Sequence, residues 1–347
     1  MRGDRVLADA PSAQTRLLGE ILRRKDATDG RSPHWDATKL ARKRFRACHI
    51  RTKPKRVMGN ITFNQDGQMS NKDQIDYWNG PGGEKWVTHA DRLDGLLAPF
   101  AEAVLDQAQL QSGESVLDIG CGAGALSLKA AGQVGEMRGV RGVDVSRPLV
   151  GLASQRAALS GAPAKFEVAD ASAYRAPDPI DAVISRFGVM FFEDPVSAFA
   201  NIRISVRPEG RIVFACWQSL ALNDWASAPL EAAIPLLPAP PTPPPAGAPG
   251  PFAFADRDYV SSILRDAGWR GIAVTPWQDN LRLPGNSIAE VAGFMMELGP
   301  VARLVKEAGV DLAKVEMALQ TSLELHLQKD GHVYMPAAAW IVSATAS

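Results

Sequence analysis

The sequence is poor in cysteine and histidine, and this scarcity argues against several kinds of site. The three cysteines (Cys48, Cys121 and Cys216) lie far apart and form no CxxC pair. They therefore support neither a zinc site nor a disulfide framework. Such cysteine usage is typical of a reducing cytoplasm, which is the location we expect. Only five histidines are present, and we predict no metal site.

Long, uninterrupted apolar runs are also missing. The longest stretch with little charge, residues 226–255, is crowded with prolines and cannot form a membrane helix. The first ten residues contain acidic side chains where a signal peptide needs an apolar core. The 38 basic and 38 acidic residues balance, which gives no whole-chain argument for nucleic-acid binding. We therefore expect neither a membrane span nor a nucleic-acid partner.

The charge is nevertheless unevenly distributed. Residues 1–57 hold 16 Lys or Arg and 6 Asp or Glu, and the block at residues 42–56 has neither helical nor strand periodicity. A basic tail can bind nucleic acid or an anionic surface, but nothing downstream suggests either. We interpret residues 1–57 as a basic, disordered N-terminal extension. An early start codon, with Met58 or Met69 as the true first residue, is an alternative explanation.

Apolar strands and helices alternate between residues 111 and 220, which we predict to be the core. Strands are expected at 115–120, 140–145, 165–170, 181–187 and 210–217, and helices at 123–134, 147–160 and 194–206. Apolar strands with helices between them predict a parallel sheet covered on both faces. Residues 58–110 predict a helical cap, with a short helix, a Gly-Pro turn at 80–83 and a longer amphipathic helix.

The alternation is interrupted over residues 221–330. Nine prolines in residues 234–252 predict a stiff, extended connector or lid segment. Helices are expected at 256–269, 287–298 and 300–328, with a strand at 271–279 between the first two. Residues 331–347 then supply a last core strand.

The stretch VLDIGCGAG, residues 116–124, joins a strand to a helix. Gly120, Gly122 and Gly124 let a ligand approach the backbone, and the helix N-terminus offers free N–H groups. The same glycines loosely match a dinucleotide-binding pattern, so an NAD(P)-dependent oxidoreductase is one alternative. Asp118 distinguishes the two ligand classes, because a carboxylate beside the turn repels a pyrophosphate and attracts an ammonium group.

S-adenosylmethionine (SAM) carries an ammonium, a sulfonium and a ribose diol, and no phosphate. Asp118 therefore favours this cofactor over a dinucleotide. Asp144 lies twenty residues after Gly124, at the end of the second expected strand. There it is placed to accept hydrogen bonds from ribose hydroxyls.

Five segments occur in register: VLDIGCGAG (116–124), GVDVS (142–146), VADAS (168–172), ISRFGVMFFEDP (184–195) and RPEGRIVFACW (207–217). Together they resemble the class I SAM-dependent methyltransferases, in the broad set that includes the quinone-pathway C-methyltransferases. The resemblance implies an α/β fold with a Rossmann-like seven-stranded sheet, mostly parallel with an antiparallel last strand. Helices would cover both faces, and a helical cap would be added. Glu209 departs from the pattern, since the family usually has glycine there.

The resemblance also implies methyl transfer from SAM to a small-molecule acceptor. The cofactor-binding residues would be Tyr77, Trp78, Asp118, Gly120, Cys121, Gly122, Gly124, Asp144, Val145, Asp170, Ala171, Arg186 and Phe187. Asp170 would face the adenine amino group, and Arg186 would hold the SAM carboxylate or an acidic substrate group. Trp86 and Met190 are expected to contact the acceptor.

His89 is the candidate general base, because it lies on the helix expected above the SAM pocket. A purely structural role for this histidine is the alternative. A non-catalytic SAM- or nucleotide-binding module is a further alternative to an enzyme. The sequence leaves the oligomeric state and the identity of the acceptor open.

Overall fold

The computed structural model describes residues 71–241, 244–245, 247–298, 301, 304–305 and 308–346. Every described residue belongs to one compact unit within residues 61–347. The predicted basic extension at residues 1–57 lies outside the described residues and stays a prediction.

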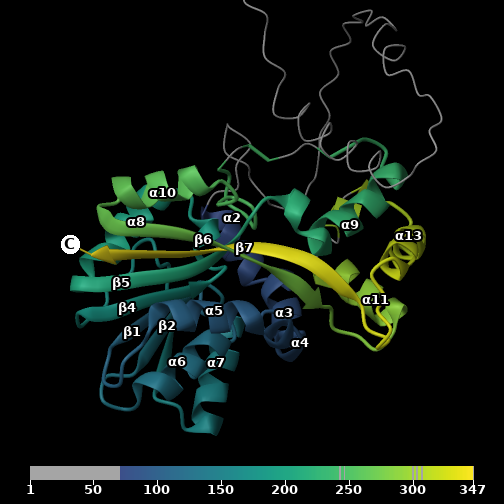
Figure 1. Ribbon diagram of the computed structural model, residues 1–347. Coiled ribbons are helices and arrows are strands. Elements are labelled where there is room, and N and C mark those ends of the chain that lie inside the picture. The colour runs from purple at the N-terminus through teal and green to yellow at the C-terminus, as the bar shows by residue number, and fades with distance from the viewer. Residues whose placement is uncertain are drawn as a thin grey trace, which may run out of the picture. The chain divides into compact units, whose positions relative to one another are not determined.

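A seven-stranded sheet forms the centre of this unit (Figure 1). Its strands are β1 (Val116–Ile119), β2 (Val140–Asp144), β3 (Ala164–Val168), β4 (Ile180–Arg186), β5 (Val206–Trp217), β6 (Trp269–Arg282) and β7 (Tyr334–Ala346). The strand order is β3-β2-β1-β4-β5-β7-β6. β7 pairs antiparallel with both neighbours, and the remaining neighbours pair in parallel. The predicted mostly parallel sheet with an antiparallel last strand is confirmed.

Helices cover both faces of this sheet. The described helices are α2 (Asn71–Trp78), α3 (Pro81–Thr88), α4 (Ala90–Leu96), α5 (Ala98–Ala108), α6 (Ala125–Val134), α7 (Arg147–Ser160), α8 (Pro195–Ile204), α9 (Asp224–Ala233), α10 (Arg257–Asp266), α11 (Ile288–Leu298) and α13 (Leu312–Glu324). In Figure 1, α5, α6 and α7 lie on one side of the sheet and α8 and α10 on the other. The same view places α9, α11 and α13 together near the end where β7 begins.

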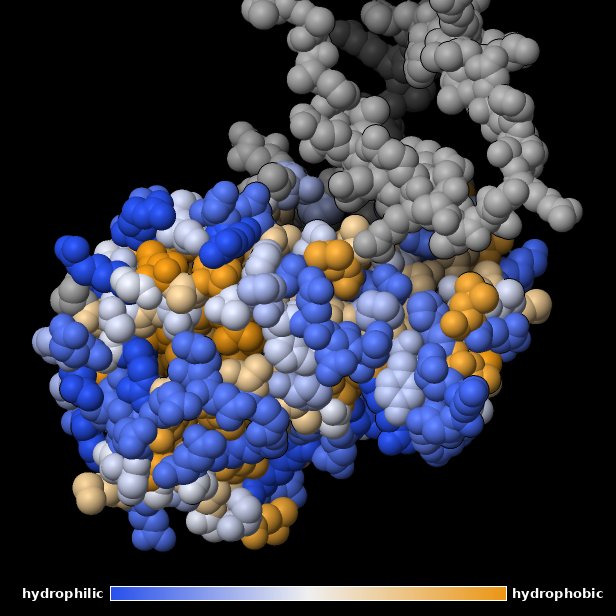
Figure 2. All heavy atoms as spheres, in the orientation of Figure 1, coloured by the Kyte–Doolittle hydropathy of each residue, from blue (hydrophilic) through white to orange (hydrophobic). Residues whose placement is uncertain are grey.

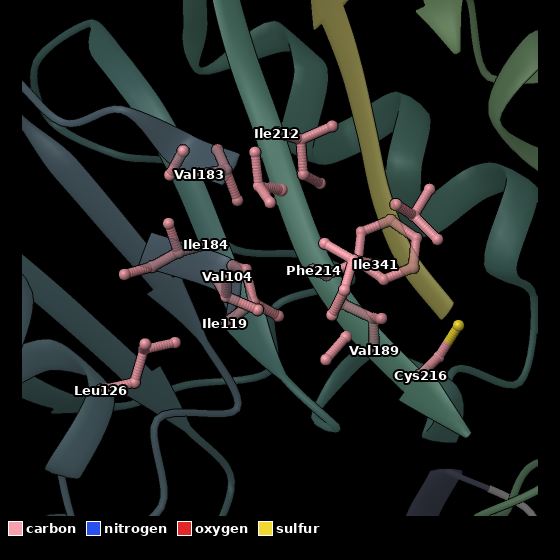
Figure 3. Close-up of a cluster of buried hydrophobic side chains, with 14 of the residues drawn as sticks. Val104, Ile119, Leu126, Val183, Ile184, Val189, Ile212, Phe214, Cys216 and Ile341 are labelled. Atoms are coloured by element: carbon pink, nitrogen blue, oxygen red, sulfur yellow. The ribbon is translucent and has the colours of Figure 1, made fainter. Parts of the chain in front are cut away.

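Burial explains why the central strands read as apolar runs. All four residues of β1 are buried, and β4 is buried up to its last residue, Arg186. Figure 3 shows the resulting core, in which Val104 of α5 lies beside Ile184 of β4 and Ile119 of β1. A sheet buried on both faces needs this near-continuous apolar pattern.

Side-chain caps fix where several helices begin. Ser146 accepts a hydrogen bond from the backbone N–H of Leu149 at the start of α7, and Asp194 accepts one from Ser197 at the start of α8. Each cap follows a strand-to-helix connection. It satisfies a donor that the first turn of a helix otherwise leaves unpaired.

Two predicted helical segments differ from the structure. The predicted turn at residues 80–83 is instead the start of α3, because Pro81 occupies a first-turn position that needs no N–H donor. The predicted single helix at 300–328 is interrupted: residues 301, 304–305 and 308 are helical, but residues 309–311 are not. Gly309 adopts a left-handed conformation (φ +63°), and Asp311 caps a new helix, α13.

Hydrophilic side chains cover most of the face seen in Figure 2, with smaller apolar patches between them. Among the described helices, none is long and apolar enough to cross a membrane.

Candidate functional site

A cavity of about 480 Å³ lies at the carboxyl ends of β1, β2 and β4. This is where open α/β sheets bind ligands. Residues of α2, α3, α4 and α11 also line the cavity, as do residues 249–251 from the end of the proline-rich segment. Twelve of the predicted site residues line it: Tyr77, Trp78, Trp86, Asp118, Gly120, Cys121, Gly122, Asp144, Val145, Arg186, Phe187 and Met190.

The glycines of the turn after β1 serve different purposes. Gly120 has φ +66°, and a Cβ there would lie 2.6 Å from the Cα of Gly188, so the loops after β1 and β4 touch backbone to backbone. Gly122 has φ +53°, but a Cβ there would meet nothing within 4 Å. The backbone at Gly122 therefore borders open space, which is what close approach of a ligand requires.

Asp118 is buried, and one of its carboxylate oxygens is left without a protein partner. Its Oδ2 accepts a hydrogen bond from the Ser127 hydroxyl at 2.5 Å, whereas Oδ1 has none. Burial raises the pKa of Asp118 to about 7, against opposing effects from Ser127 and the nearby Arg186. A buried carboxylate oxygen without a donor is costly. A bound cation at this position would satisfy it.

Asp144 ties the glycine turn to the end of β2. Its Oδ2 accepts the backbone N–H of Gly122 at 2.9 Å, and its Oδ1 accepts that of Ser146 at 2.8 Å. Burial raises its pKa, and these backbone donors oppose that shift. The carboxylate thus has a structural role, and it also lines the cavity as the ribose prediction requires.

Asp170, Ala171 and Gly124 are not among the described residues that line the cavity. Asp170 accepts hydrogen bonds from the backbone N–H and the hydroxyl of Ser172 after β3. A Cβ at Gly124 would lie 2.9 Å from the Phe166 ring, so this glycine permits helix-to-sheet packing. The adenine-binding roles of Asp170 and Ala171 stay predictions.

The cap is anchored to the core next to Asp144. The Asn79 side chain donates to the carbonyl of Val145 at 2.8 Å and accepts the backbone N–H of Arg147 at 3.0 Å. The Ser146 hydroxyl donates to the carbonyl of Trp78 at 2.8 Å. These bonds hold Trp78 at the cavity. Sequence reasoning missed Asn79, although it directly follows the predicted Tyr77-Trp78 pair.

Arg186, at the end of β4, lines the cavity as predicted. Its guanidinium lies 3.2 Å from Asp94 and 3.5 Å from the carbonyl of Leu97, and its side chain is 12% exposed. Asp94 also accepts a 2.8 Å bond from Arg156. One carboxylate is therefore shared between two guanidinium groups, and Asp94 itself lines the cavity.

An aromatic wall completes the cavity, and part of it was not predicted. Phe187, predicted as a cofactor contact, has φ +62° and stacks on Trp217 with ring centroids 4.0 Å apart. Trp225 lies 4.8 Å from Trp217. Further lining residues that sequence reasoning missed are Gln74, Leu281, Leu283, Phe294, Met295 and Leu298. They lie on α2, β6, α11 and the loop after β6, so no single local motif marks them.

His89 lies outside the described lining of the cavity. Its Nε2 is 2.6 Å from a carboxylate oxygen of Glu297, and its ring packs edge-on against Phe294. This contact links the α3–α4 junction to α11. The general-base role of His89 stays a prediction, and the structure adds a structural role for it.

Cys121 is buried in the glycine turn, and burial raises the pKa of its thiol. A thiolate there is therefore disfavoured. Among the described residues, no group of three His, Cys, Asp or Glu side chains could hold a metal ion.

The donors and acceptors at the end of the cavity nearest β1 and β2 fit SAM. The partnerless Oδ1 of Asp118 suits an ammonium group, Asp144 suits a diol, and the open side of Gly122 leaves room for either. A pyrophosphate would instead face two carboxylates. The arrangement favours a cationic, phosphate-free nucleoside.

Residues 116–210 match a protein family described as a methyltransferase domain. The chain is 28% identical over 226 residues to nocamycin O-methyltransferase of Saccharothrix syringae, covering 60% of this chain and 80% of that protein. It is 33% identical over 127 residues to aklanonic acid methyltransferase DauC of Streptomyces sp. (strain C5), covering 36% and 58%. The chain thus spans less than two thirds of the second relative. The family match runs from β1 into β5, over the glycine turn and both acids.

Two solved structures are similar at TM-scores below 0.5. YcgJ from Bacillus subtilis has a TM-score of 0.47 and 15% identity, over 72% of this chain and 98% of that chain. Haemonchus contortus phosphoethanolamine N-methyltransferase 2, with S-adenosylhomocysteine, has a TM-score of 0.48 and 16% identity, over 77% and 59%.

Proposed function

We propose that this chain, whose residues 116–210 match a methyltransferase domain, transfers a methyl group from SAM to a small, largely apolar acceptor. One observation carries the proposal: a single cavity joins the glycine turn and its acids to an aromatic wall. Donor and acceptor would therefore meet in one enclosed space, which favours an in-line transfer.

Different residues of the chain would bind different parts of SAM. Asp118 would bind the ammonium group of SAM, Asp144 would bind its ribose, and the turn at Gly122 would let the cofactor approach the backbone. SAM supplies a methyl group that its sulfonium has already activated. What remains for the protein is to position the acceptor and exclude water.

The acceptor side is supported by the lining and by the relatives. Trp86 and Met190, which we predicted as acceptor contacts, both line the cavity, together with Trp225 and Phe294. Two relatives are named for a chemical compound, nocamycin and aklanonic acid. A cavity of about 480 Å³ suits a compound of similar class better than a macromolecule.

The free, buried thiols of Cys121 and Cys216 support a cytoplasmic setting for this reaction.

Titration calorimetry with S-adenosylhomocysteine (SAH) and with NAD⁺ tests the proposal directly. We expect SAH to bind with a micromolar or lower Kd and NAD⁺ to give no heat. Methyl-labelled SAM and a panel of apolar acids and phenols would then reveal turnover. Binding of NAD⁺ without binding of SAH would overturn the proposal and restore the oxidoreductase alternative.

A further inference from the structure

The charged side chains that line the cavity are few. Among the described lining residues, the acids are Asp94, Asp118 and Asp144, and Arg186 is the one cation. Neither histidine nor lysine occurs in that set, and its one hydroxyl side chain, Tyr77, is 40% exposed. The acceptor therefore meets a mostly apolar surface with one positive charge.

Each of the three acids has another role in the proposed function or in the fold. Asp118, in β1, accepts a bond from Ser127 and would bind the ammonium group of SAM. Asp144, at the end of β2, accepts the backbone N–H of Gly122. Asp94 accepts from two arginines. An alcohol or amine acceptor needs a base to remove its proton, whereas an acceptor that is already an anion needs none.

Arg186 makes two long polar contacts within the protein. Its contacts to Asp94 and Leu97 are 3.2 and 3.5 Å long, at or beyond the usual range for such bonds. The carboxylate of Asp94 also accepts a bond from Arg156, which lies closer at 2.8 Å and pairs with Asp91 as well. A guanidinium that is 12% exposed is stabilised by an anion that accepts its remaining N–H groups.

Building on the proposed function, we propose that the acceptor is a two-oxygen acid on an apolar body: a carboxylate or an enolised 1,3-dicarbonyl. One oxygen accepts hydrogen bonds from Arg186, and the other is methylated. The lone pair of that oxygen forms the new O–C bond as the S–C bond breaks, and the S–C electron pair stays on sulfur. The anionic and sulfonium charges both disappear, and no proton moves.

Anthraquinone-2-carboxylate and its carboxamide form a matched pair of probes that differ in charge but hardly in shape. Trp78, Trp86, Trp217 and Trp225 line the cavity, so quenching of tryptophan fluorescence reports binding without turnover. With the SAH-loaded full chain at pH 8, we expect the acid to bind at least about 10-fold more tightly than the amide.

Variants test whether Arg186 causes this preference. We expect Arg186→Gln to bind acid and amide equally and Arg186→Lys to keep part of the preference. Arg257→Gln is the matched control, because Arg257 is an exposed arginine on α10 outside the cavity lining. It should behave like the wild type.

Two results would overturn the inference. The first is equal binding of acid and amide by the wild type. The second is an Arg186→Gln variant that keeps the acid preference but loses SAH affinity, which would assign Arg186 to the cofactor carboxylate. SAH binding by the wild type tests the proposed function separately, so the two proposals can fail independently.

Discussion

The chain builds the two ends of the cavity in different ways. At the cofactor end, residues 118–127 and Asp144 supply backbone groups and buried carboxylates whose positions are fixed by hydrogen bonds. At the acceptor end, side chains from α3, β5, α9 and α11 supply apolar surface. The cofactor end requires its backbone groups in fixed positions, so one added atom should abolish cofactor binding there. The acceptor end depends on apolar volume, which tolerates change better.

Gly120→Ala should give the largest effect. The new methyl group would lie 2.6 Å from the Cα of Gly188, on a backbone with φ +66°. We expect a loss of about 3 kcal/mol in the free energy of unfolding, from overlap and backbone strain together. SAH binding should become undetectable. Urea denaturation and calorimetry measure the two effects.

Gly151→Ala is the matched control for that substitution. Gly151 lies inside α7, and a Cβ there meets nothing within 4 Å. It should raise the stability by about 0.5–1 kcal/mol and leave SAH affinity unchanged. Equal effects of the two substitutions would contradict the distinction between a glycine that the turn requires and one that a helix merely tolerates.

Asp118→Asn should weaken SAH binding at pH 8 by about 10- to 100-fold, since it removes a charged partner of the ammonium group. The pKa of Asp118 is about 7. We therefore expect wild-type affinity to rise as pH increases through 7 and the affinity of the variant to stay flat over that range. Calorimetry at several pH values measures both trends. A parallel rise in the variant would assign the pH dependence to another group.

The same substitution should stabilise the protein without ligand. Because the pKa of Asp118 is raised from 3.8 to about 7, the folded state binds more protons than the unfolded state between those values. The wild-type free energy of unfolding then falls as pH rises across this window. Asp118→Asn should be about 2 kcal/mol more stable than the wild type at pH 8, and this difference should shrink toward pH 5. Denaturation at both pH values checks this.

The cofactor end could be predicted because its residues are close in sequence. Asp118 lies near the end of β1, Gly120 and Gly122 follow that strand directly, and the strand-turn-helix pattern fixes where it ends. Asp144 could be predicted in the same way, because it ends the next strand, β2. The partner of Asp118, Ser127, could not be predicted, because its hydroxyl reaches Asp118 only once α6 packs against β1.

The acceptor end could be predicted only in part. Trp86 was predicted because it follows the Tyr77-Trp78 pair in the cap, and Met190 because it lies in the segment that follows β4. Trp217, Trp225 and Phe294 come from a strand end and two helices that lie far apart in the sequence and that pack against β7 or α13. Apolar residues in such helices look like ordinary core residues in the sequence, because both kinds repeat with the same helical period.

Trp225→Ala tests the acceptor end directly. Trp225 lies on α9, 4.8 Å from Trp217, and no contact ties it to the glycine turn. We expect affinity for anthraquinone-2-carboxylate to fall about 10-fold, from lost apolar and aromatic contact, and SAH affinity to stay within about twofold. Trp277→Ala, outside the cavity lining, should reduce stability and leave both affinities unchanged. Loss of SAH binding in Trp225→Ala would show that the two ends are not independent.

His89→Ala should have the smallest effect and bears on the link between α3–α4 and α11. The Glu297 side chain that contacts His89 is about half exposed. Solvent-exposed pairs of this kind contribute about 0.2–1 kcal/mol to the free energy of unfolding. We expect a stability loss in that range and turnover within about threefold of the wild type, because the histidine lies outside the cavity lining. Glu297→Ala should give a similar stability loss, since it removes the carboxylate that contacts His89. A drop in turnover of about 100-fold in His89→Ala alone, with unchanged binding of SAH and probe, would instead make His89 the general base. The acceptor would then need deprotonation, and its assignment as an acid would fail with it.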